Sequence, residues 1–566
     1  MNEEERRKII SNDYANILTE YTVRSKKSEM LKDETFNYID DKYAVVYIAK
    51  DRLPININIE PEFYTALPKL FGLLDILSLE ETGVTHLQAT PFLSLMGQGT
   101  LLGFIDTGID YRNPLFRNAD NTTRILSIWD QTIENLQAPQ DIFYYGTEYS
   151  REQINLALQN DAPLSVVPST DVIGHGTTLA GLAGGSKDEE HDFVGVVPSS
   201  EYVIVKLKEA KANIKEYLLV PPDVTCYAQD DIMFGLRYLV NIAMKVNKPI
   251  AICIGLGSNQ GGHEGLDYLS DMLSSLAYQV GVAIVIAAGN EGNSGHHFYG
   301  EIDKTKGFTL VELNVGEKEN DFTMELWGNT PGTYSIDIIS PSGEYISRIP
   351  ARLGENRVIT FIFEVTTITL DYLIVEAQSG DELILIRFKA PAPGRWRFKV
   401  YSGQITSGFH IWLPMRGFIT ENTAFLSPNP YTTVTNPGNS MLTITTTAYD
   451  YSNDSLYINA SRGYTRSNMI KPELATPGVN VYSPLPNNTF GAASGTSIAA
   501  ALLTGITAIL LEWGVVKKNA RAMNTIVVRN YLIRGVEQNE TLTYPNKEWG
   551  YGRVNIFDTF KSLSGE

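Results

Sequence analysis

The distribution of apolar and polar residues divides the chain into stretches of different character. From Gly99 onward, short apolar runs that are typical of buried strands alternate with amphipathic runs that are typical of helices. The predicted strands cover residues 101–105, 202–205, 250–254 and 282–287, and the predicted helices include residues 231–246 and 266–280. This alternation predicts an α/β domain whose parallel sheet is covered by helices on both faces.

A second pattern begins at about residue 307, where β-type runs follow one another without intervening helices. The predicted strands cover residues 308–315, 322–327, 333–339, 358–365, 370–376, 382–388 and 395–401. Turn signals such as Pro341-Ser342-Gly343 separate them, which predicts an all-β sandwich inserted into the α/β domain. The α/β pattern then resumes with a strand at residues 441–446 and a helix from Ser497.

The N-terminal stretch has a charged, helical opening followed by strand-like runs at residues 44–48 and 55–59, and we expect it to form a small separate module. No apolar stretch of signal-peptide length follows the first charged residues, so a Sec-type signal is not expected. The longest apolar run, residues 498–511, contains Thr504, Gly505 and Thr507 and is too short for a membrane span. We therefore expect a buried core helix there, synthesis in the cytoplasm and no membrane insertion.

Composition narrows the classes of partner. The chain has 566 residues, enough for about two to four domains. Its 65 acidic and 46 basic residues give a net charge of −19, which disfavours nucleic acid and anionic membranes as partners. Cys226 and Cys253 could in principle form one disulfide, but the apolar run around Cys253 favours a small buried residue. His191 stands in an acidic run that fits a surface loop better than a metal site, and we expect no metal or cofactor.

Four short motifs carry residues that could act in one reaction. Asp106 ends a predicted strand, and His175 lies between two glycines at the start of a predicted helix. Asn290 follows another predicted strand, and Ser497 begins the long apolar helix. Each motif alone is common as a cap or a turn, but their joint occurrence indicates a catalytic set.

The four residue types have complementary chemistry. A serine hydroxyl needs a base, and a histidine has the intrinsic pKa to serve Ser497 in that role. The carboxylate of Asp106 can orient His175 and offset its positive charge. The side-chain amide of Asn290 can donate to an oxyanion, together with the backbone N–H of Ser497.

With these motifs in the order aspartate, histidine, serine, the sequence resembles the subtilisin-like serine peptidases over residues 83–295 and 430–560. The resemblance implies a serine endopeptidase that hydrolyses polypeptide substrates through an acyl-enzyme. It assigns the triad to Asp106, His175 and Ser497, the oxyanion site to Asn290, and a substrate-binding ridge to Gly255-Leu256-Gly257. Two departures, Thr178 and Ala501-Leu502, lie outside the triad, and we expect them to affect helix packing and pocket shape.

The long gap between Asn290 and Ser497 accommodates the β insertion. With this insertion, the resemblance implies four segments: a prodomain (1–77), a first subtilase segment (78–300), a jelly-roll-like β-sandwich (301–425) and a second subtilase segment (426–566). This architecture resembles the Csp germination proteases of clostridia. The resemblance implies a zymogen that cleaves itself within residues 72–82, a prodomain that can stay bound and inhibit, activation of a protein substrate by limited proteolysis, and association with the spore.

Two other functions remain open at this stage. The chain could be a catalytically idle sensor or scaffold, because the Csp group includes members whose triads have decayed, although all three positions are intact here. It could also be a binding protein whose function lies in the β insertion. For His296-His297 the sequence leaves two alternatives, a solvated turn or the leaving-group side of the site.

Overall fold

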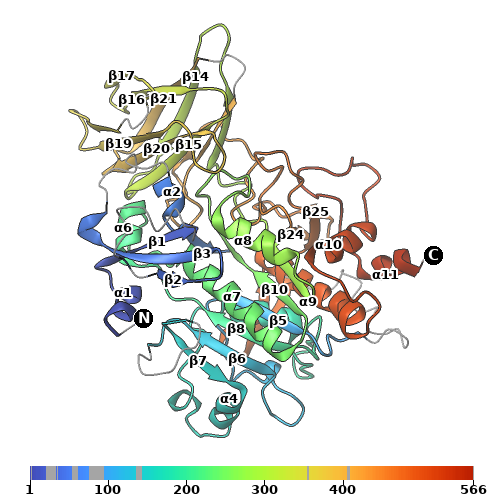
Figure 1. Ribbon diagram of the computed structural model, residues 1–566. Helices are drawn as coiled ribbons and strands as arrows, with labels where there is room; N and C mark the ends of the chain where they lie inside the picture. Colours follow the sequence, from blue (N-terminus) through green and yellow to red (C-terminus); the bar gives the residue numbers. More distant parts are fainter. Residues whose placement is uncertain are drawn as a thin grey trace.

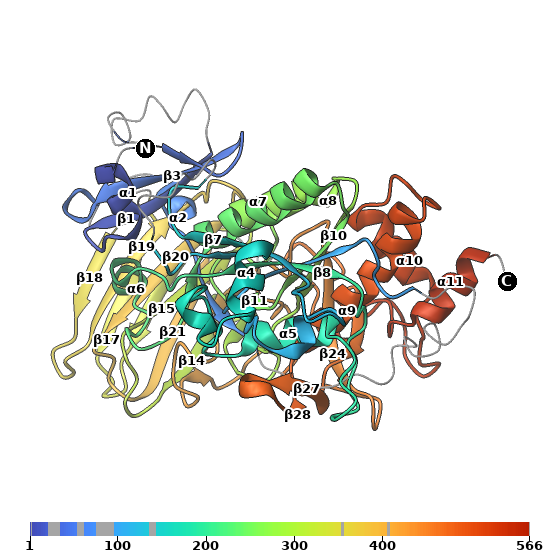
Figure 2. The ribbon, with the colours of Figure 1, turned by 90° about the horizontal axis from the view of Figure 1, so that it is seen from below.

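The computed structural model describes residues 1, 3–20, 34, 36–53, 62–74, 95–134, 143–352, 356–403 and 408–564. Figure 1 shows a small N-terminal sheet, a large sheet flanked by helices, and a module of two further β-sheets. In the view of Figure 2 the N-terminal sheet lies beside both the large sheet and the β module.

The large sheet runs in the order β25-β24-β12-β10-β5-β8-β6-β7, with β26 paired to β24. Neighbouring strands are parallel except for β25 and β7, which are antiparallel to their neighbours. The strands are β5 (Leu101–Asp106), β6 (Ile125–Asp130), β7 (Thr147–Ser150), β8 (Glu201–Lys206), β10 (Ile250–Ile254), β12 (Val282–Ala287), β24 (Ile444–Asp450), β25 (Ser455–Leu456) and β26 (Leu474–Pro477). The predicted mostly parallel sheet is confirmed, although β24 begins three residues later than residue 441 and the sequence pattern missed β6, β7, β25 and β26.

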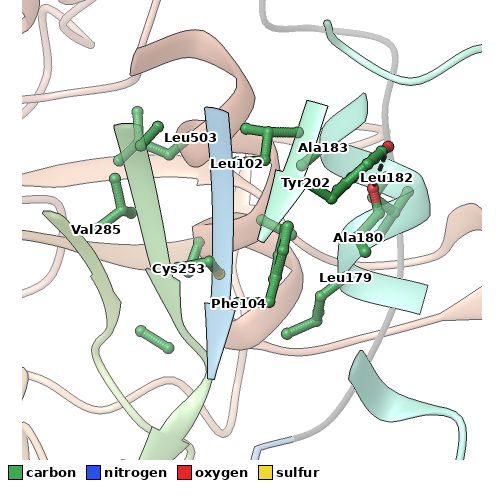
Figure 3. Close-up of a cluster of buried hydrophobic side chains, with 14 of the residues drawn as sticks. Leu102, Phe104, Leu179, Ala180, Leu182, Ala183, Tyr202, Cys253, Val285 and Leu503 are labelled. Atoms are coloured by element: carbon green, nitrogen blue, oxygen red, sulfur yellow. Dashed lines mark hydrogen bonds between the residues drawn. The ribbon is translucent and has the colours of Figure 1, made fainter. Parts of the chain in front are cut away.

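Helices cover both faces of this sheet. Helices α5 (His175–Gly184) and α9 (Thr496–Leu511) pack on one face, and α7 (Gln229–Val246) and α8 (Tyr268–Ala277) pack on the other. The side chains of β5 alternate between them: Leu102 and Phe104 lie in the cluster with α5 and α9 (Figure 3), and Leu101 lies in the opposite cluster. The remaining α-helices of this part are α4 (Arg151–Leu158), α6 (Ala212–Leu218), α10 (Thr525–Arg534) and α11 (Ile556–Ser564).

Helix α9 is the central core helix. From Thr496 to Val516 the helical segment is long and apolar enough to cross a membrane, but 89% of its most apolar window is buried inside the protein. This agrees with the predicted core helix. Cys226 and Cys253 are free and buried, and Cys253 packs among the residues drawn in Figure 3.

The N-terminal sheet has the order β1-β3-β2 and is antiparallel. Its elements are α1 (Glu3–Ile10), β1 (Tyr14–Glu20), β2 (Phe36–Tyr38) and β3 (Tyr43–Ala49), and α2 (Glu62–Ala66) follows them in the chain. Alternate residues of β3 face two different cores: Val45 lies in a cluster with α7 and α8, and Val46 lies in a cluster with Trp327 and Leu383 of the β module. The N-terminal sheet therefore packs against both the large domain and the β module. The strand predicted at residues 55–59 lies outside the described residues.

The β module consists of two antiparallel sheets, with the orders β13-β22-β15-β20-β19-β18 and β17-β16-β21-β14-β23, around one apolar core. The strands are β13 (His297–Glu301), β14 (Thr309–Val315), β15 (Phe322–Gly328), β16 (Tyr334–Ile339), β17 (Tyr345–Ile349), β18 (Asn356–Thr360), β19 (Thr367–Leu373), β20 (Glu382–Lys389), β21 (Gly394–Ser402), β22 (Gly408–Trp412) and β23 (Ala424–Phe425). The predicted insertion of β-sheets is confirmed.

One predicted strand of this module is wrong in its second half. The pattern predicts a strand over residues 358–365, but β18 ends at Thr360. The carboxylate of Glu344 accepts the backbone N–H groups of Ile362 and Phe363, which a strand would direct to a neighbouring strand. Residues 361–366 therefore form an ordered loop in which Ile362, Phe363 and Val365 are exposed.

Candidate active site

Three side chains that are far apart in the sequence lie together at one edge of the large sheet. Asp106 is the last residue of β5, His175 is the first residue of α5, and Ser497 is the second residue of α9. The Nδ1 atom of His175 lies 2.7 and 2.9 Å from the two carboxylate oxygens of Asp106, and all three side chains are buried. The structure brings the predicted acid, base and nucleophile together.

The position of His175 depends on a second carboxylate. Asp171 accepts the backbone N–H of Gly174 at 2.7 Å and that of Thr177 at 2.9 Å, so it caps the first turn of α5. Asp171 is not among the residues predicted from the sequence. The signal that could have found it is an aspartate placed shortly before the first residue of a predicted helix.

The backbone of an N-terminal segment occupies the site. The carbonyl oxygen of Leu74 lies 2.6 Å from Ser497 Oγ, which donates to it, and 2.6 Å from His175 Nε2. The expected self-cleavage within residues 72–82 places this segment in the site, but the sequence pattern does not indicate which of its residues contacts Ser497. The carbonyl group is the part of a peptide bond that a serine nucleophile attacks.

The segment before Leu74 lies in the site as an extended strand. Strand β4 (Leu70–Leu73) pairs antiparallel with β11 (Leu256–Gly257) on one side and with β9 (Tyr227–Ala228) on the other. In this register Gly72 lies opposite Gly257, and Leu73 lies opposite Leu256. The predicted ridge, Gly255-Leu256-Gly257, thus forms one wall of a peptide groove. Strand β9 forms the other wall and is not predicted from the sequence.

Gly255 lies against the triad. A Cβ atom at this position would approach His175 Cε1 to 3.1 Å, Ser497 Cβ to 3.3 Å and Leu179 Cδ1 to 2.8 Å. Any side chain at residue 255 would therefore displace His175, Ser497 or Leu179.

Two carboxylates of the β module hold the start of the occupying segment. Tyr64 donates a hydrogen bond of 2.7 Å to Glu325, and Thr65 donates one of 2.8 Å to Glu376. All four side chains are buried. The β module therefore contacts the same N-terminal segment that enters the groove.

The protonation of His175 follows from its neighbours. Burial lowers the pKa of its imidazole, but the charge and hydrogen bond of Asp106, followed by the Leu74 carbonyl, raise it, and the net pKa lies above the ordinary value. The geometry requires the same direction, because Nδ1–H donates to the carboxylate and Nε2 needs a proton to donate to the Leu74 oxygen. With the segment bound, the imidazolium form is favoured.

Asn290 lies at the beginning of the loop after β12 and is buried beside α9. Its amide oxygen accepts from the backbone N–H of Thr496 at 3.3 Å and from the hydroxyl of Thr496 at 3.1 Å. These two bonds fix the orientation of the side chain. Nδ2 is then the atom of this amide that can donate to a substrate.

A buried contact between a carboxylate and a histidine lies next to Asn290, and the sequence pattern does not reveal it. Glu291 lies 2.7 Å from His296 Nδ1 and accepts the backbone N–H of Arg416 at 2.8 Å. Burial raises the pKa of the Glu291 carboxyl, but the charge and hydrogen bond of His296 lower it, and the net pKa lies below its usual value. An ionised Glu291 thereby ties the turn at residues 415–418 to the loop that carries Asn290.

Of the two alternatives predicted for His296-His297, the solvated turn is wrong, because both side chains are buried. His297 Nε2 lies 2.9 Å from His410 Nδ1, and His297 Nδ1 donates to the carbonyl of Asn429 at 3.1 Å. The ring of Trp412 stacks on His297 at 4.8 Å and on His410 at 5.1 Å. We call this group the histidine joint, since it connects β13 and β22 of the module to residues 429–432 of the large domain.

Other residues singled out in the sequence have packing contacts. Thr178 donates a hydrogen bond of 2.7 Å to the carbonyl of Pro484, and Ala501 and Leu502 are buried in the core around α9. His191 lies 3.0 Å from Asp188 and stacks on Phe490. Within the described residues, no group of three or more histidine, cysteine, aspartate or glutamate side chains could hold a metal ion.

A cavity of about 370 Å³ adjoins the triad. It is lined by Leu73, Leu74, Ile173, His175, Asn290, Glu291, Met415, Arg416, Gly417, Tyr457 and Asn459. Because both His175 and Asn290 face it, this cavity offers room next to the position where a carbonyl group would react.

The chain is similar to several known proteases. A sequence model of the subtilase family, Peptidase S8, matches residues 97–309 and 421–552, more than half of the chain. C5a peptidase of Streptococcus pyogenes is 24% identical over 443 residues, which cover 73% of this chain but only 35% of that protein. Subtilisin of Bacillus sp. (strain TA39) is 26% identical over 245 residues, which cover 42% of this chain and 46% of subtilisin.

A solved structure, that of the Clostridium perfringens CspB protease, is similar over most of the molecule. The TM-score is 0.76 at 30% sequence identity, and the match covers 85% of this chain and 96% of that one. Together with the family match on both sides of the inserted module and the grouping of Asp106, His175 and Ser497, these comparisons identify the chain as a member of the subtilase family.

Proposed function

We propose that the chain is a serine endopeptidase, made as a zymogen that cuts its own chain between Leu74 and Asp75. The observation that carries this proposal is the Leu74 carbonyl oxygen, 2.6 Å from both Ser497 Oγ and His175 Nε2. The bond lies within residues 72–82, where self-cleavage is expected from the sequence, and residues 75–82 of that interval lie outside the described residues.

The described arrangement fits a held, inhibited state better than the moment of attack. His175 Nε2 faces the Leu74 oxygen, so it cannot accept the proton of Ser497 at the same time. For acylation, the Leu74 oxygen would move to the amide of Asn290 and to the backbone N–H of Ser497. His175 would then take the proton as Oγ attacks the carbonyl carbon, and would pass it to the departing amine of Asp75. Water would hydrolyse the ester that links Leu74 to Ser497.

The chain length of the purified protein tests this proposal. We expect two fragments from the wild-type chain, the larger one beginning at Asp75, and one intact chain from Ser497→Ala. A fluorophosphonate should label Ser497 in the wild-type protein and should not label the variant. A single intact wild-type chain with no label would instead favour the idle scaffold.

For the physiological role we propose limited proteolysis of a protein substrate. The likeness to the clostridial CspB protease in sequence and architecture supports this role, and with it an association with the spore during germination. Cleavage of one or a few bonds in a purified candidate protein, rather than general degradation of casein, is the expected result. Rapid degradation of casein would argue against a restricted role.

A further inference from the structure

The peptide groove is covered at one position by a turn that leaves the β module. The turn consists of residues 415–418, which we call the covering turn, and it is closed by a hydrogen bond of 3.0 Å from Phe418 N to the Met415 oxygen. Gly417, the third residue of the turn, has φ +86°, a conformation that favours glycine. Met415 and Phe418 are buried, in the same cluster as Leu70 and Leu74.

The covering turn meets the bound segment at Gly72. A Cβ atom on Gly72 would lie 3.1 Å from Met415 Cε, from Met415 Sδ and from Phe418 Cε1. These contacts are tighter than an ordinary van der Waals distance, and all three come from the covering turn. An alanine methyl group would require the Met415 and Phe418 side chains to shift by a few tenths of an ångström, and a branched or longer side chain would require larger displacements.

The neighbouring positions of the segment have different surroundings. Phe71 and Leu74 are large apolar residues that are fully or almost fully buried, and Leu73 is half-buried. If the bond after Leu74 is cut, Gly72 is the third residue and Phe71 the fourth residue before that bond. The groove thus combines apolar sites at the first and fourth positions with a closed third position.

We infer that the covering turn selects substrates that carry glycine at the third residue before the cleaved bond, with large apolar residues at the first and fourth. Alanine is accepted at a nearly normal rate. This inference rests on the proposed function, because only an active peptidase selects substrates. The steric exclusion at residue 72 does not depend on catalysis. It also gives the β module a role in specificity, because the module's last long strand, β22, leads into the covering turn.

The test uses the full-length chain with Gly72→Ala, Gly72→Val and Gly72→Leu. We expect processing to be nearly normal in Gly72→Ala and slower by on the order of tenfold to a hundredfold in the other two, the range that overpacking a close-packed site produces. Met415→Ala, added to Gly72→Val, should restore most of the rate. The matched control is Met244→Ala, since Met244 is 68% exposed on α7 and should give no rescue.

A second measurement separates this inference from the proposed function. In the Ser497→Ala background, Gly72→Val should lower the thermal midpoint, and Met415→Ala should recover part of the loss, while Met244→Ala should not. Processing of Gly72→Val at the wild-type rate overturns the inference, as does a block that Met415→Ala fails to relieve. If the wild-type chain is never processed, the proposed function fails, and the coupling between residues 72 and 415 in the thermal midpoints alone decides the inference.

Discussion

Asn16 of strand β1 donates a hydrogen bond of 2.6 Å from Nδ2 to the carboxylate of Asp230 on helix α7, and both side chains are buried. Among the described residues, the other oxygens of this pair, Asn16 Oδ1 and Asp230 Oδ1, have no hydrogen-bond partner. This pair joins the N-terminal sheet to the large domain. When Asp230 is ionised, two buried acceptor oxygens of the pair face no donor among the described residues. A proton on Asp230 would provide the donor that the pair lacks.

The first prediction follows from this pair. Burial, and then the charge of Asp231, raise the pKa of Asp230 to about 6. The folded state binds this proton more tightly than the unfolded state, so the free energy of unfolding falls as the pH rises from about 4 through about 6. We expect Asp230→Asn, measured by thermal unfolding, to raise the free energy of unfolding at pH 7.5 by about 1–3 kcal/mol and to change little at pH 4.

The neighbouring aspartate is the contrasting variant. Asp231 pairs with Lys208 and accepts a hydrogen bond of 2.8 Å from Tyr145. Asp231→Asn would leave the buried ammonium group without its carboxylate and should destabilise the protein. Equal shifts in the two variants would contradict the role given to Asp230.

The second prediction concerns Asn290. If its amide donates to the oxyanion, Asn290→Ala should lower kcat on a peptide substrate by about 10²–10³-fold, the range known for loss of one such donor in subtilisin. KM should change little, because the contact is made in the transition state. Steady-state kinetics on a short chromogenic peptide measure both constants. An unchanged kcat would remove Asn290 from the mechanism.

The third prediction is that release of the N-terminal segment depends on pH. After Asp106, the hydrogen bond to the Leu74 carbonyl is a further cause that raises the pKa of His175 in the described state. This contact therefore contributes at pH values below the pKa of the free histidine and is lost as the pH rises through the pKa in the complex. We expect the cleaved N-terminal fragment to dissociate faster at pH 8.5 than at pH 5.5, as measured by size-exclusion chromatography. In His175→Gln, prepared by co-expressing the two fragments, this difference should be much smaller.

The fourth prediction concerns the anchor of the covering turn. Glu291→Ala would leave His296, Asn259 and the Arg416 N–H without a carboxylate, and breaking such a buried group should cost about 3–5 kcal/mol of unfolding free energy. It should also relax the preference for glycine at residue 72, because the turn is no longer held. Arg416→Ala is the control for stability: it keeps the backbone N–H, and its side chain pairs only loosely with exposed Glu421, at 3.9 Å.

The fifth prediction concerns the histidine joint in acid. Burial, and then neighbouring histidine charge, lower the pKa of His297 to about 3 and hold that of His410 well below its ordinary value. An unfolded histidine takes up its proton near pH 6.5, so stability is lost as the pH falls from about 6.5 toward about 4. The fluorescence of Trp412, which stacks on both rings, should report this loss.

His297→Gln keeps a donor and an acceptor but does not titrate, and we expect it to flatten the pH dependence between pH 4 and 6.5. A wild-type protein whose midpoint is constant over this interval would contradict the assignment.

The sequence predicted the parts of the site that follow from local pattern. Asp106 ends a run of buried β residues and His175 begins an apolar helix, so both could be assigned to the edge of a parallel sheet. Ser497, at the N-terminus of α9, could be assigned by the same reasoning. In each case the position of the side chain is set by its own strand or helix.

The rest of the site depends on contacts between distant segments, which periodicity does not encode. The Leu74 carbonyl reaches Ser497 only because β4 pairs with β11 and β9, and Met415 meets Gly72 only after the β module has docked. His296 reads as polar loop in the sequence, yet its pairing with Glu291 allows it to be buried. The loop at residues 361–366 is the opposite case, since its apolar residues read as a buried strand but stay in solvent.

The clasp formed by Tyr64 on Glu325 and Thr65 on Glu376 lies on the N-terminal side of the bond that we expect to be cut. Cutting after Leu74 would therefore turn one chain into a two-subunit assembly without loosening the clasp itself. The cut changes the effective concentration at which the N-terminal segment rebinds. A tethered segment rebinds at a fixed effective concentration, whereas a cleaved segment can be diluted away. The fraction of inhibited molecules would then depend on the protein concentration. The number of contacts that remain with the β module would set how long each molecule stays inhibited.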